Sequence, residues 1–374
     1  YYWQLIFGGT VLGGTNQKAH AYVAKLSPQN GEALYAVDLG SSPTQDTYIT
    51  DMKVSSSHIY ITGTFGATAT FGTQNVTTFG FSDIFVAQLD LLGNCTWVRN
   101  IGGAHNDFSG GVCFDQVGNV YICGAISWNV HFPGLPTTSN LGGDDQAFYA
   151  KFDSLGTCLF YRIMGNHNQD DYAMKIACDP LGNIAVTGYY NSFGGAGIFG
   201  TDTIYSVSNS YDIFIARYSA IGNFIPGVKS YGGADIDRGQ DIIYDAPSNA
   251  YFVAGMFGGS VLFDNTLLTV PGGLNYGNYV GSIPNYINTT GVGEVTQGDR
   301  NDFEVYPSII TENFTIKSRL DSRMLLVDNT GRIILDERIK AGEETFPKPA
   351  VKKGIYFVNL QNEKGGFTKK VLFQ

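Results

Sequence analysis

The sequence predicts an all-β chain, with a tandem array of four-stranded antiparallel sheets followed by a small β-sandwich. Three observations support this prediction. The 374 residues include 48 Gly, 23 Tyr and 25 Phe, a composition typical of strands joined by tight turns, because aromatic rings fill pleated surfaces and glycine tolerates positive φ. A pattern of about 60 residues recurs over the first three quarters of the chain. No stretch keeps a helical period long enough for βαβ units.

The recurring unit is easiest to see in two segments. Residues 111–126 read GVCFDQVGNVYICGAI and residues 175–190 read KIACDPLGNIAVTGYY, and each has two β-rich runs joined by a Gly-Asn turn, which is a hairpin signal. The glycines that end the hairpins lie 61, 64 and 67 residues apart: Gly63, Gly124, Gly188 and Gly255. Aromatic residues at a second repeat position lie 63, 63 and 66 residues apart: Tyr22, Phe85, Phe148 and Phe214.

Each period holds four short strands. Within residues 107–163 we expect them at 110–115, 119–125, 146–152 and 157–163. Four strands in each tandem period of about 60 residues predict the blades of a β-propeller, with innermost strands at 46–54, 107–115, 171–179 and 237–245. The pattern begins inside a unit at residues 3–10 and stops after residues 275–283, so we expect about four to five blades and further sequence before Tyr1.

A resemblance to a known family rests on the same cycle. The pattern SDIFVA-L-D--G, then GG---D and D--GNVYI-G, resembles the SBBP-type repeats of bacterial proteins. The resemblance covers roughly residues 1–283 and implies a β-propeller, a fold that this family often builds from more blades than this sequence supplies. It therefore implies an incomplete ring.

Charge is distributed unevenly along the chain. The formal net charge is −10, yet residues 298–374 hold 13 Lys and Arg against 11 Asp and Glu, which leaves 10 basic and 22 acidic residues in 1–297. An acidic surface repels phosphates, so we expect no nucleic-acid partner. No apolar run approaches the roughly 18 residues of a membrane-spanning helix, and we expect no membrane-spanning segment.

Five cysteines stand at positions 95, 113, 123, 158 and 178. An odd number without CxxC spacing predicts neither a zinc site nor a disulfide framework. Cys95 and Cys158 share one repeat position, so we expect them to pack as small apolar residues.

After a linker expected at residues 284–301, the pattern changes to six or seven short amphipathic strands in 302–374, which predict a small immunoglobulin-like β-sandwich. Motifs in this tail resemble the C-terminal sorting domain of type IX secretion substrates from Bacteroidetes. The family pattern is a Tyr-Pro start, a V-x-D-x-x-G-+ hairpin, a G-x-Y-x-V strand and a basic last strand. These elements fall on Tyr306, Pro307, Val327, Asp328, Gly331, Arg332, Gly354, Tyr356, Val358, Lys369, Lys370 and Val371.

The second resemblance implies a route and partners. The protein would leave through the type IX translocon, with an outer-membrane shuttle barrel binding residues 302–374, and would reach the cell surface or the medium. A terminal strand with free edges would be captured by strand addition, in which backbone hydrogen bonds provide affinity. The alternative is an immunoglobulin-like appendage without a sorting role.

Candidate ligand-binding residues lie in the loops between units. Four aspartates are equivalent, and two neighbouring loops carry a histidine: Asp46, Asp107, Asp171 and Asp237, with His105 and His167. Such a ring would bind a cation or a polar ligand, but recurrence in every unit favours a structural role, in which each Asp caps its own turn. Aromatic residues after the second strands would stack on sugars, although core packing is the favoured interpretation: Trp128, Phe132, Tyr189 and Tyr190.

The sequence contains no GxSxG, HExxH or Walker motif. We therefore predict no catalytic residues, no metal and no cofactor. The leading hypothesis is a secreted or cell-surface binding or adhesion protein, linked to attachment or gliding motility, whose propeller binds a surface glycan or a protein. Two alternatives stay open: a glycan-acting hydrolase or lyase with its site on the propeller's loop face, and a scaffold from a larger surface protein.

Overall fold

The computed structural model describes residues 4–7, 9–13, 18–40, 42, 44–138, 143–165, 168–270, 275–284, 303–307, 309–328, 333–362 and 365–373. These ranges are all-β, with one short 3-10 turn at Val207–Asn209 and no α-helix. The chain forms two compact units, Tyr1–Pro284 and Asn285–Gln374, which we call the repeat unit and the tail unit. Within the described ranges, no helix has the length and apolar character that crossing a membrane requires.

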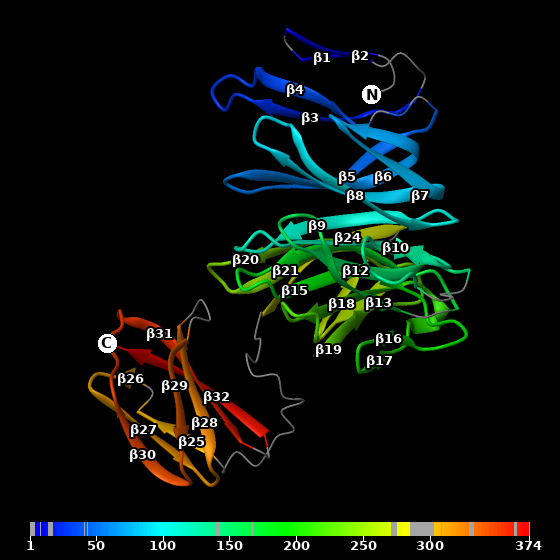
Figure 1. Ribbon diagram of the computed structural model, residues 1–374. Helices are drawn as coiled ribbons and strands as arrows, with labels where there is room; N and C mark the ends of the chain where they lie inside the picture. The colour runs from blue at the N-terminus through cyan, green and yellow to red at the C-terminus, as the bar shows by residue number, and fades with distance from the viewer. Residues whose placement is uncertain are drawn as a thin grey trace. The chain divides into compact units, whose positions relative to one another are not determined.

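The repeat unit contains four consecutive antiparallel sheets in which the member strands pair in chain order, with small hairpins or short strands between some of them (Figure 1). Sheet I consists of β5 (Thr47–Val54), β6 (His58–Phe71), β7 (Gln74–Asp90) and β8 (Cys95–Gly103), with β11 (Val130–His131) added at the β8 edge. Sheet II consists of β9 (Phe108–Phe114), β10 (Val120–Ile126), β12 (Gln146–Phe152) and β13 (Cys158–Met164).

The next two sheets follow the same order. Sheet III consists of β14 (Tyr172–Cys178), β15 (Ile184–Tyr190), β18 (Asp212–Tyr218) and β19 (Phe224–Tyr231). Sheet IV has three described strands, β20 (Arg238–Asp245), β21 (Ala250–Gly258) and β24 (Tyr276–Pro284). Before sheet I, β3 (Ala21–Leu26) pairs with β4 (Ala33–Leu39). Small hairpins complete the unit: β1 (Gln4–Phe7) with β2 (Thr10–Gly13), β16 (Gly197–Phe199) with β17 (Asp202–Ile204), and β22 (Ser260–Phe263) with β23 (Thr266–Thr269).

The strand predictions for residues 107–163 are confirmed, since all four strands of sheet II begin and end within about two residues of the expected positions. The four segments expected to be innermost are the first strands of sheets I to IV. Each of these first strands packs beside the next one, β5 beside β9, β9 beside β14 and β14 beside β20. The sheets are therefore joined along their first strands.

Each of the four sheets contains a glycine that faces an aromatic ring on the neighbouring strand. Each repeat glycine on the second strand pairs directly with an aromatic residue on the third: Gly63 with Phe85, Gly124 with Phe148, Gly188 with Phe214 and Gly255 with Tyr279. The aromatic ring covers the glycine, because a Cβ atom built there would lie 2.7–3.0 Å from the ring. The spacing of the aromatic positions in the sequence thus has a structural cause.

The other side of each glycine explains why no larger residue fits. A Cβ atom would lie 1.9, 2.1, 1.8 and 2.0 Å from a backbone carbonyl oxygen of the first strand, at Tyr48, Phe108, Tyr172 and Arg238 respectively. Opposite each glycine the ladder slips by one residue in a β-bulge. A bulge bends its strand and changes the direction of its backbone groups, so the bulge and the glycine form one recurring device.

The β3–β4 pair shows what a sheet loses without this device. Tyr22 on β3 occupies the aromatic repeat position, but among the described residues β3 pairs only with β4. Its side chain is 41% exposed, whereas Phe85, Phe148 and Phe214 are 0% exposed. Among the described residues, Tyr22 has no glycine-bearing strand opposite its ring.

A disulfide corrects the interpretation of the cysteines. Cys113 on β9 and Cys178 on β14 are bonded and so join the first strands of sheets II and III. The odd count hid this pair, and the two cysteines stand one register position apart in the repeat. The prediction that Cys95 and Cys158 pack as small apolar residues is confirmed, because Cys158 is buried and Cys95 lies against the core around Phe85. Cys123 is a buried free thiol.

The tail unit consists of two sheets. One contains β25 (Phe303–Tyr306), β27 (Asn313–Ser318) and β30 (Gly342–Pro347). The other has the order β26 (Ile309–Ile310), β32 (Gly365–Phe373), β31 (Gly354–Asn362), β28 (Ser322–Asp328) and β29 (Ile333–Ile339). The structure describes eight strands here, whereas six or seven were expected. The difference includes β26, which at two residues is too short to predict.

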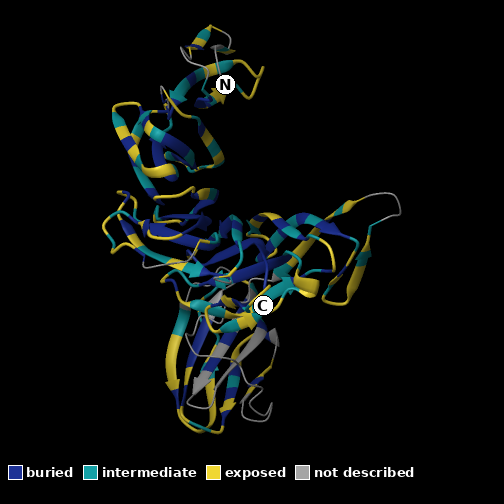
Figure 2. Cartoon of the chain, turned by 90° about the vertical axis from the view of Figure 1, so that its right-hand side faces the viewer, coloured by how far each residue is buried: buried dark blue, intermediate teal, exposed yellow. Residues whose placement is uncertain are grey.

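One apolar core joins the two tail sheets. Phe314 and Ile316 from the first sheet pack with Leu326, Val358 and Phe373 from the second, and all five are fully buried. In both units buried residues run along the strands, and exposed residues mark the loops (Figure 2). The edge strand β30 is mostly exposed as well. The tail unit therefore has a core of its own.

Candidate functional site

The repeat aspartates accept hydrogen bonds from backbone N–H groups around them, and at Asp107 and Asp237 these groups lie at the ends of two successive sheets. Asp107 and Asp237 are 0% exposed. Each accepts a hydrogen bond from the backbone N–H four residues earlier, Gly103 at 2.9 Å and Gly233 at 2.7 Å. Each also accepts one from the end of the second strand, where Ser127 N lies at 3.4 Å from Asp107 and Gly258 N lies at 2.9 Å from Asp237.

Asp171 follows the same pattern, since its carboxylate accepts a hydrogen bond from Asn191 N at 2.9 Å and is fully buried. Asp46 differs: it is half-buried and accepts from Ala19 N at 2.6 Å. His105 is exposed and stacks on Trp128 with ring centroids 5.2 Å apart. His167 lies outside the described residues. All four repeat aspartates therefore accept hydrogen bonds from backbone N–H groups of the protein.

Sequence reasoning missed a second set of buried carboxylates. Asp83 and Asp212 stand in the SDIF and YDIF motifs and are almost fully buried. In each, Oδ2 accepts a backbone N–H, from Phe79 at 2.8 Å and from Val207 at 2.9 Å. The Oδ1 atom of each has no hydrogen-bond partner within the described part of the chain. The sequence signal for these carboxylates was an aspartate that recurs two residues before the aromatic repeat position.

The buried aspartates form two pairs of carboxyl groups, Asp83 with Asp107 and Asp212 with Asp237. Burial raises the pKa of Asp83 to about 7 and that of Asp107 to about 8, and the charge of Asp83 contributes to the second shift. In the equivalent pair, burial raises the pKa of Asp212 to about 7 and that of Asp237 to about 6, and the charge of Asp237 raises the pKa of Asp212. Two neighbouring carboxyls in a dry site favour protonation of one of them.

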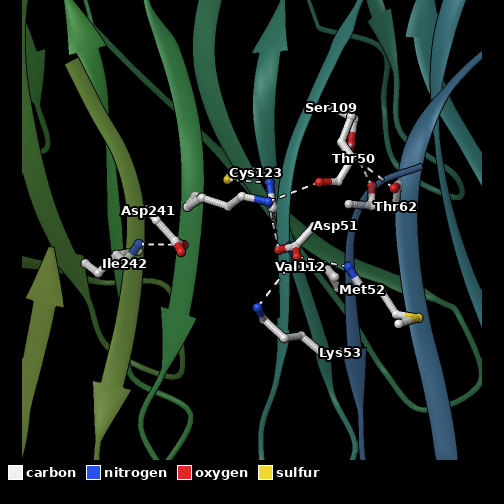
Figure 3. Close-up of polar contacts among 12 residues, drawn as sticks. Thr50, Asp51, Met52, Lys53, Thr62, Ser109, Val112, Cys123, Asp241 and Ile242 are labelled. Atoms are coloured by element: carbon white, nitrogen blue, oxygen red, sulfur yellow. Dashed lines mark hydrogen bonds and ion pairs between the residues drawn. The ribbon is translucent and has the colours of Figure 1, made fainter. Parts of the chain in front are cut away.

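A polar cluster connects the first strands of sheets I to III (Figure 3). Asp51 on β5 accepts hydrogen bonds from Val112 N at 3.0 Å and Met52 N at 2.9 Å, and it lies 3.3 Å from Lys175 Nζ on β14. The lysine crosses β9 because Gly111 has no side chain: a Cβ there would lie 2.9 Å from Lys175 Cδ. This ion pair therefore bridges two sheets across a third.

The same cluster continues through hydroxyl groups. Thr50 Oγ1 donates to Ser109 Oγ at 2.9 Å, and Ser109 Oγ lies 2.8 Å from Thr62 Oγ1. Because these groups satisfy one another within the protein, the cluster serves to hold the sheets in place. No group of three or more His, Cys, Asp or Glu side chains suited to a metal ion occurs among the described residues.

An aromatic row runs over the starts of the first strands of sheets II to IV. It consists of Phe108, Tyr172, Tyr189 and Tyr211, whose successive ring centroids lie 5.7, 5.1 and 5.4 Å apart, and Arg238, whose guanidinium lies 4.6 Å from the Tyr189 centroid. Of the aromatics expected to be candidates for stacking, Trp128 is 44% exposed and Tyr189 is 9% exposed, whereas Phe132 and Tyr190 are fully buried.

A separate hollow of about 540 Å³ lies between β3 and β5. Its lining is mostly apolar and includes Tyr22, Tyr48 and Met52, together with His20. His20 Nδ1 lies 3.3 Å from Asp38 Oδ2. None of the predicted ligand-binding residues lines this hollow.

In the tail unit, motif residues that are distant in sequence meet on one ladder. Asp328 on β28 pairs with Tyr356 on β31, and Tyr356 pairs with Val371 on β32. Gly354 pairs with Phe373, and Lys369 and Lys370 belong to β32. Tyr356 and Val371 are buried. Tyr306, at the end of β25 before Pro307, is 41% exposed, and Gly331 lies outside the described residues.

The terminal strand is less open than expected. β32 pairs with β31 along Gly365–Phe373, and its last residues also pair with β26 through Ile309–Leu372 and Ile310–Phe373. Along β32, the residues before Leu372 have one neighbouring strand, β31, among the described residues. The expectation of a free edge is therefore wrong for Leu372 and Phe373, which pair with β26, and holds for Gly365–Val371 among the described residues.

Residues 304–374 match the family described as "Secretion system C-terminal sorting domain". These residues carry a type IX sorting signal. The match assigns the chain to type IX secretion, so the protein is exported to the cell surface or the medium.

The chain is also similar to an uncharacterized WD repeat-containing protein of Acanthamoeba polyphaga mimivirus, with 25% identity over 230 residues. The match covers 54% of this chain and only 16% of that protein. Among solved structures, the extracellular domain of a one-component system of B. thetaiotaomicron has a TM-score of 0.20 at 10% identity, covering 88% of this chain and 56% of that one. A glycoside hydrolase has a TM-score of 0.21 at 10% identity, covering 85% and 95%. Scores this low carry no argument about fold or function.

Proposed function

We propose that this protein is an exported binding protein, which type IX secretion delivers and whose repeat unit presents a ligand-binding face at the cell surface or in the medium. The sorting domain joined to a series of similar sheets supports this proposal. The most prominent polar groups of the repeat unit, including the Asp51–Lys175 pair and the repeat aspartates, contact the protein itself. A rigid platform for adhesion is the function that suits this arrangement.

The repeat unit is proposed to be part of a β-propeller of SBBP type. Sheets I to III each contain the four antiparallel strands of a blade, and the first strands pack side by side as inner strands do. The similarity to a WD repeat-containing protein agrees with this architecture. For the tail unit we propose an immunoglobulin-like sandwich, on the strength of its two sheets around one core.

The proposed partners of residues 302–374 are the type IX translocon and its outer-membrane shuttle barrel. The ladder that aligns Asp328, Tyr356 and Val371 gives the motif residues a common scaffold. The ligand of the repeat unit is proposed to be a surface glycan or protein, with attachment or gliding motility as the process served.

Attachment of living cells tests the proposed function. The full chain with a signal peptide is expressed in a host that has a type IX system, beside a chain that ends before residue 302. Antibody labelling of intact cells should detect only the full chain, and those cells should attach more strongly to glycan-coated or protein-coated surfaces. Surface-exposed full chain without any change in attachment would contradict the binding proposal.

A further inference from the structure

We infer that the aromatic row binds neutral carbohydrate, with a pyranose ring stacked on the exposed face of Phe108 and hydroxyl groups bonded to nearby carboxylates. This inference rests on the proposed function and names its ligand class. The row is a surface feature, since Phe108 is 42% exposed and Tyr172 and Tyr211 are half-buried. Aromatic rings that are partly exposed provide stacking surface at little conformational cost.

The row is held in position before any ligand arrives. Tyr172 donates its hydroxyl hydrogen to Asp145 Oδ2, and Asp145 N donates to Asp170 Oδ1 at 2.9 Å. Tyr189 lies between two tyrosines and under the guanidinium of Arg238. The row begins on β9 and ends on β20, so the packing of three sheets fixes it. A preorganised surface loses little entropy on binding.

The polar groups around the row can recognise hydroxyl groups. Asp144, Asp145 and Asp170 lie close enough to Tyr189 or Tyr211 to raise their pKa values, after burial as the main cause. Arg238 lowers the same pKa values, so it shares the site with the carboxylates. Carboxylates accept hydrogen bonds from vicinal hydroxyls, and a guanidinium donates to them.

The charge around the row favours a neutral ligand over an anionic one. Asp144, Asp145 and Asp170 repel an anionic sugar or a phosphate. A neutral polyol meets no such repulsion, and its hydroxyl groups can donate to the carboxylates and accept from Arg238. The aromatic faces add the apolar surface that the C–H side of a pyranose ring covers.

The test uses the full chain and isothermal titration with hexasaccharides. Neutral cello-, malto-, xylo- and manno-oligosaccharides are compared with a cationic chitosan hexamer and an anionic oligogalacturonate. The variants are Phe108→Ala and Asp145→Asn, with Tyr205→Ala as the matched control because Tyr205 is a 69% exposed aromatic outside the row. Thermal unfolding checks that each variant is folded.

We expect at least one neutral oligosaccharide to bind, with affinity at least about tenfold weaker in Phe108→Ala and Asp145→Asn and within about twofold in Tyr205→Ala. Binding that Phe108→Ala leaves unchanged would place the ligand elsewhere and overturn the inference. Binding restricted to the charged sugars, or to none of the six, would also overturn it. In the last case, attachment of cells to a protein-coated surface would still support the proposed function, so the two failures are distinguishable.

Discussion

The repeat unit and the tail unit are both all-β, but they are stabilised in different ways. The repeat unit uses the same local device several times: a glycine, an aromatic ring and a bulged first strand. It adds buried carboxylates, a disulfide and an ion pair between sheets. The tail unit relies on one apolar core and carries a denser set of charges, 13 basic and 11 acidic in residues 298–374.

The sequence motifs of the two units therefore act in different places. In the repeat unit the recurring residues specify backbone contacts, so their recurrence indicates architecture. In the tail unit, signature residues such as Tyr356 and Val371 belong to the core, whereas Tyr306 is exposed. Loss of export after a change at Val371 would therefore report unfolding of the signal, and deletion of Lys369–Gln374 would remove Phe373 from the core as well.

The largest expected effect concerns the repeat glycines. Gly188→Ala places a Cβ 1.8 Å from the carbonyl oxygen of Tyr172 and 3.0 Å from the Phe214 ring, so backbone must move. We expect a loss of roughly 3 kcal/mol or more in the free energy of unfolding, measured by urea denaturation of the repeat unit's transition. Gly281→Ala is the control, because nothing lies within 4 Å of its Cβ. Equal stability of the two variants would break the proposed device.

The disulfide should have the next largest effect. Replacing both Cys113 and Cys178 with Ser removes a link between residues 65 apart in sequence, and such links typically contribute about 2–4 kcal/mol. We expect a lower melting temperature for the repeat unit, no change in the tail unit, and loss of the wild-type protein's sensitivity to reductant. Cys95→Ser serves as control. A wild-type protein that reductant does not destabilise would contradict the link.

The paired aspartates predict a dependence on pH. The pKa of Asp107 is about 8 and that of Asp83 about 7 in the folded protein, against ordinary values of 3.8. The folded state therefore holds protons that the unfolded chain releases, and this stabilisation, complete below about pH 4, is lost as pH rises through 7 to 8.

Between pH 6 and 8.5 the melting temperature of the repeat unit should fall. Asp83→Asn removes one charge while keeping an oxygen for Phe79 N, and should reduce the accompanying fall in the free energy of unfolding by roughly 1–2 kcal/mol. The exposed Glu337→Gln in the tail unit is the control. A fall of the same size in Asp83→Asn would show that the pair does not titrate as described.

The ion pair across Gly111 should have the smallest effect. Lys175 and Asp51 are 21% and 11% exposed, and Lys175→Met keeps the aliphatic stem while removing the charge. We expect a loss of about 1 kcal/mol in the repeat unit. The more exposed Lys229→Met, which breaks the pair with Asp264, should cost less. The reverse order would remove the special role of the cluster that bridges the sheets.

Much of the fold was predictable because repetition amplifies weak signals. One hairpin such as GVCFDQVGNVYICGAI predicts little, but four glycines at regular spacing predict a sheet in each period. The tail motifs were predictable for another reason, because several different motifs occur in the expected order.

Other features depend on pairing between sheets, which one period cannot reveal. The Cys113–Cys178 bond joins positions that differ by one in the repeat register, and Lys175 reaches Asp51 only because Gly111 intervenes. The aromatic row combines residues from three sheets, and of its members the sequence singled out Tyr189 alone. The second neighbour of β32 comes from β26, a strand too short to predict.

Export of a fusion tests whether the tail unit carries the export signal without help from the repeat unit. Residues 302–374 are joined to an unrelated folded reporter with a signal peptide in a type IX host, beside the same fusion carrying Val371→Asp, which places a charge in the core. We expect the first reporter to reach the cell surface or the medium and the second to stay in the periplasm. Retention of the first reporter in the periplasm, or export of the second at the same level, would contradict an independent export signal with a folded core.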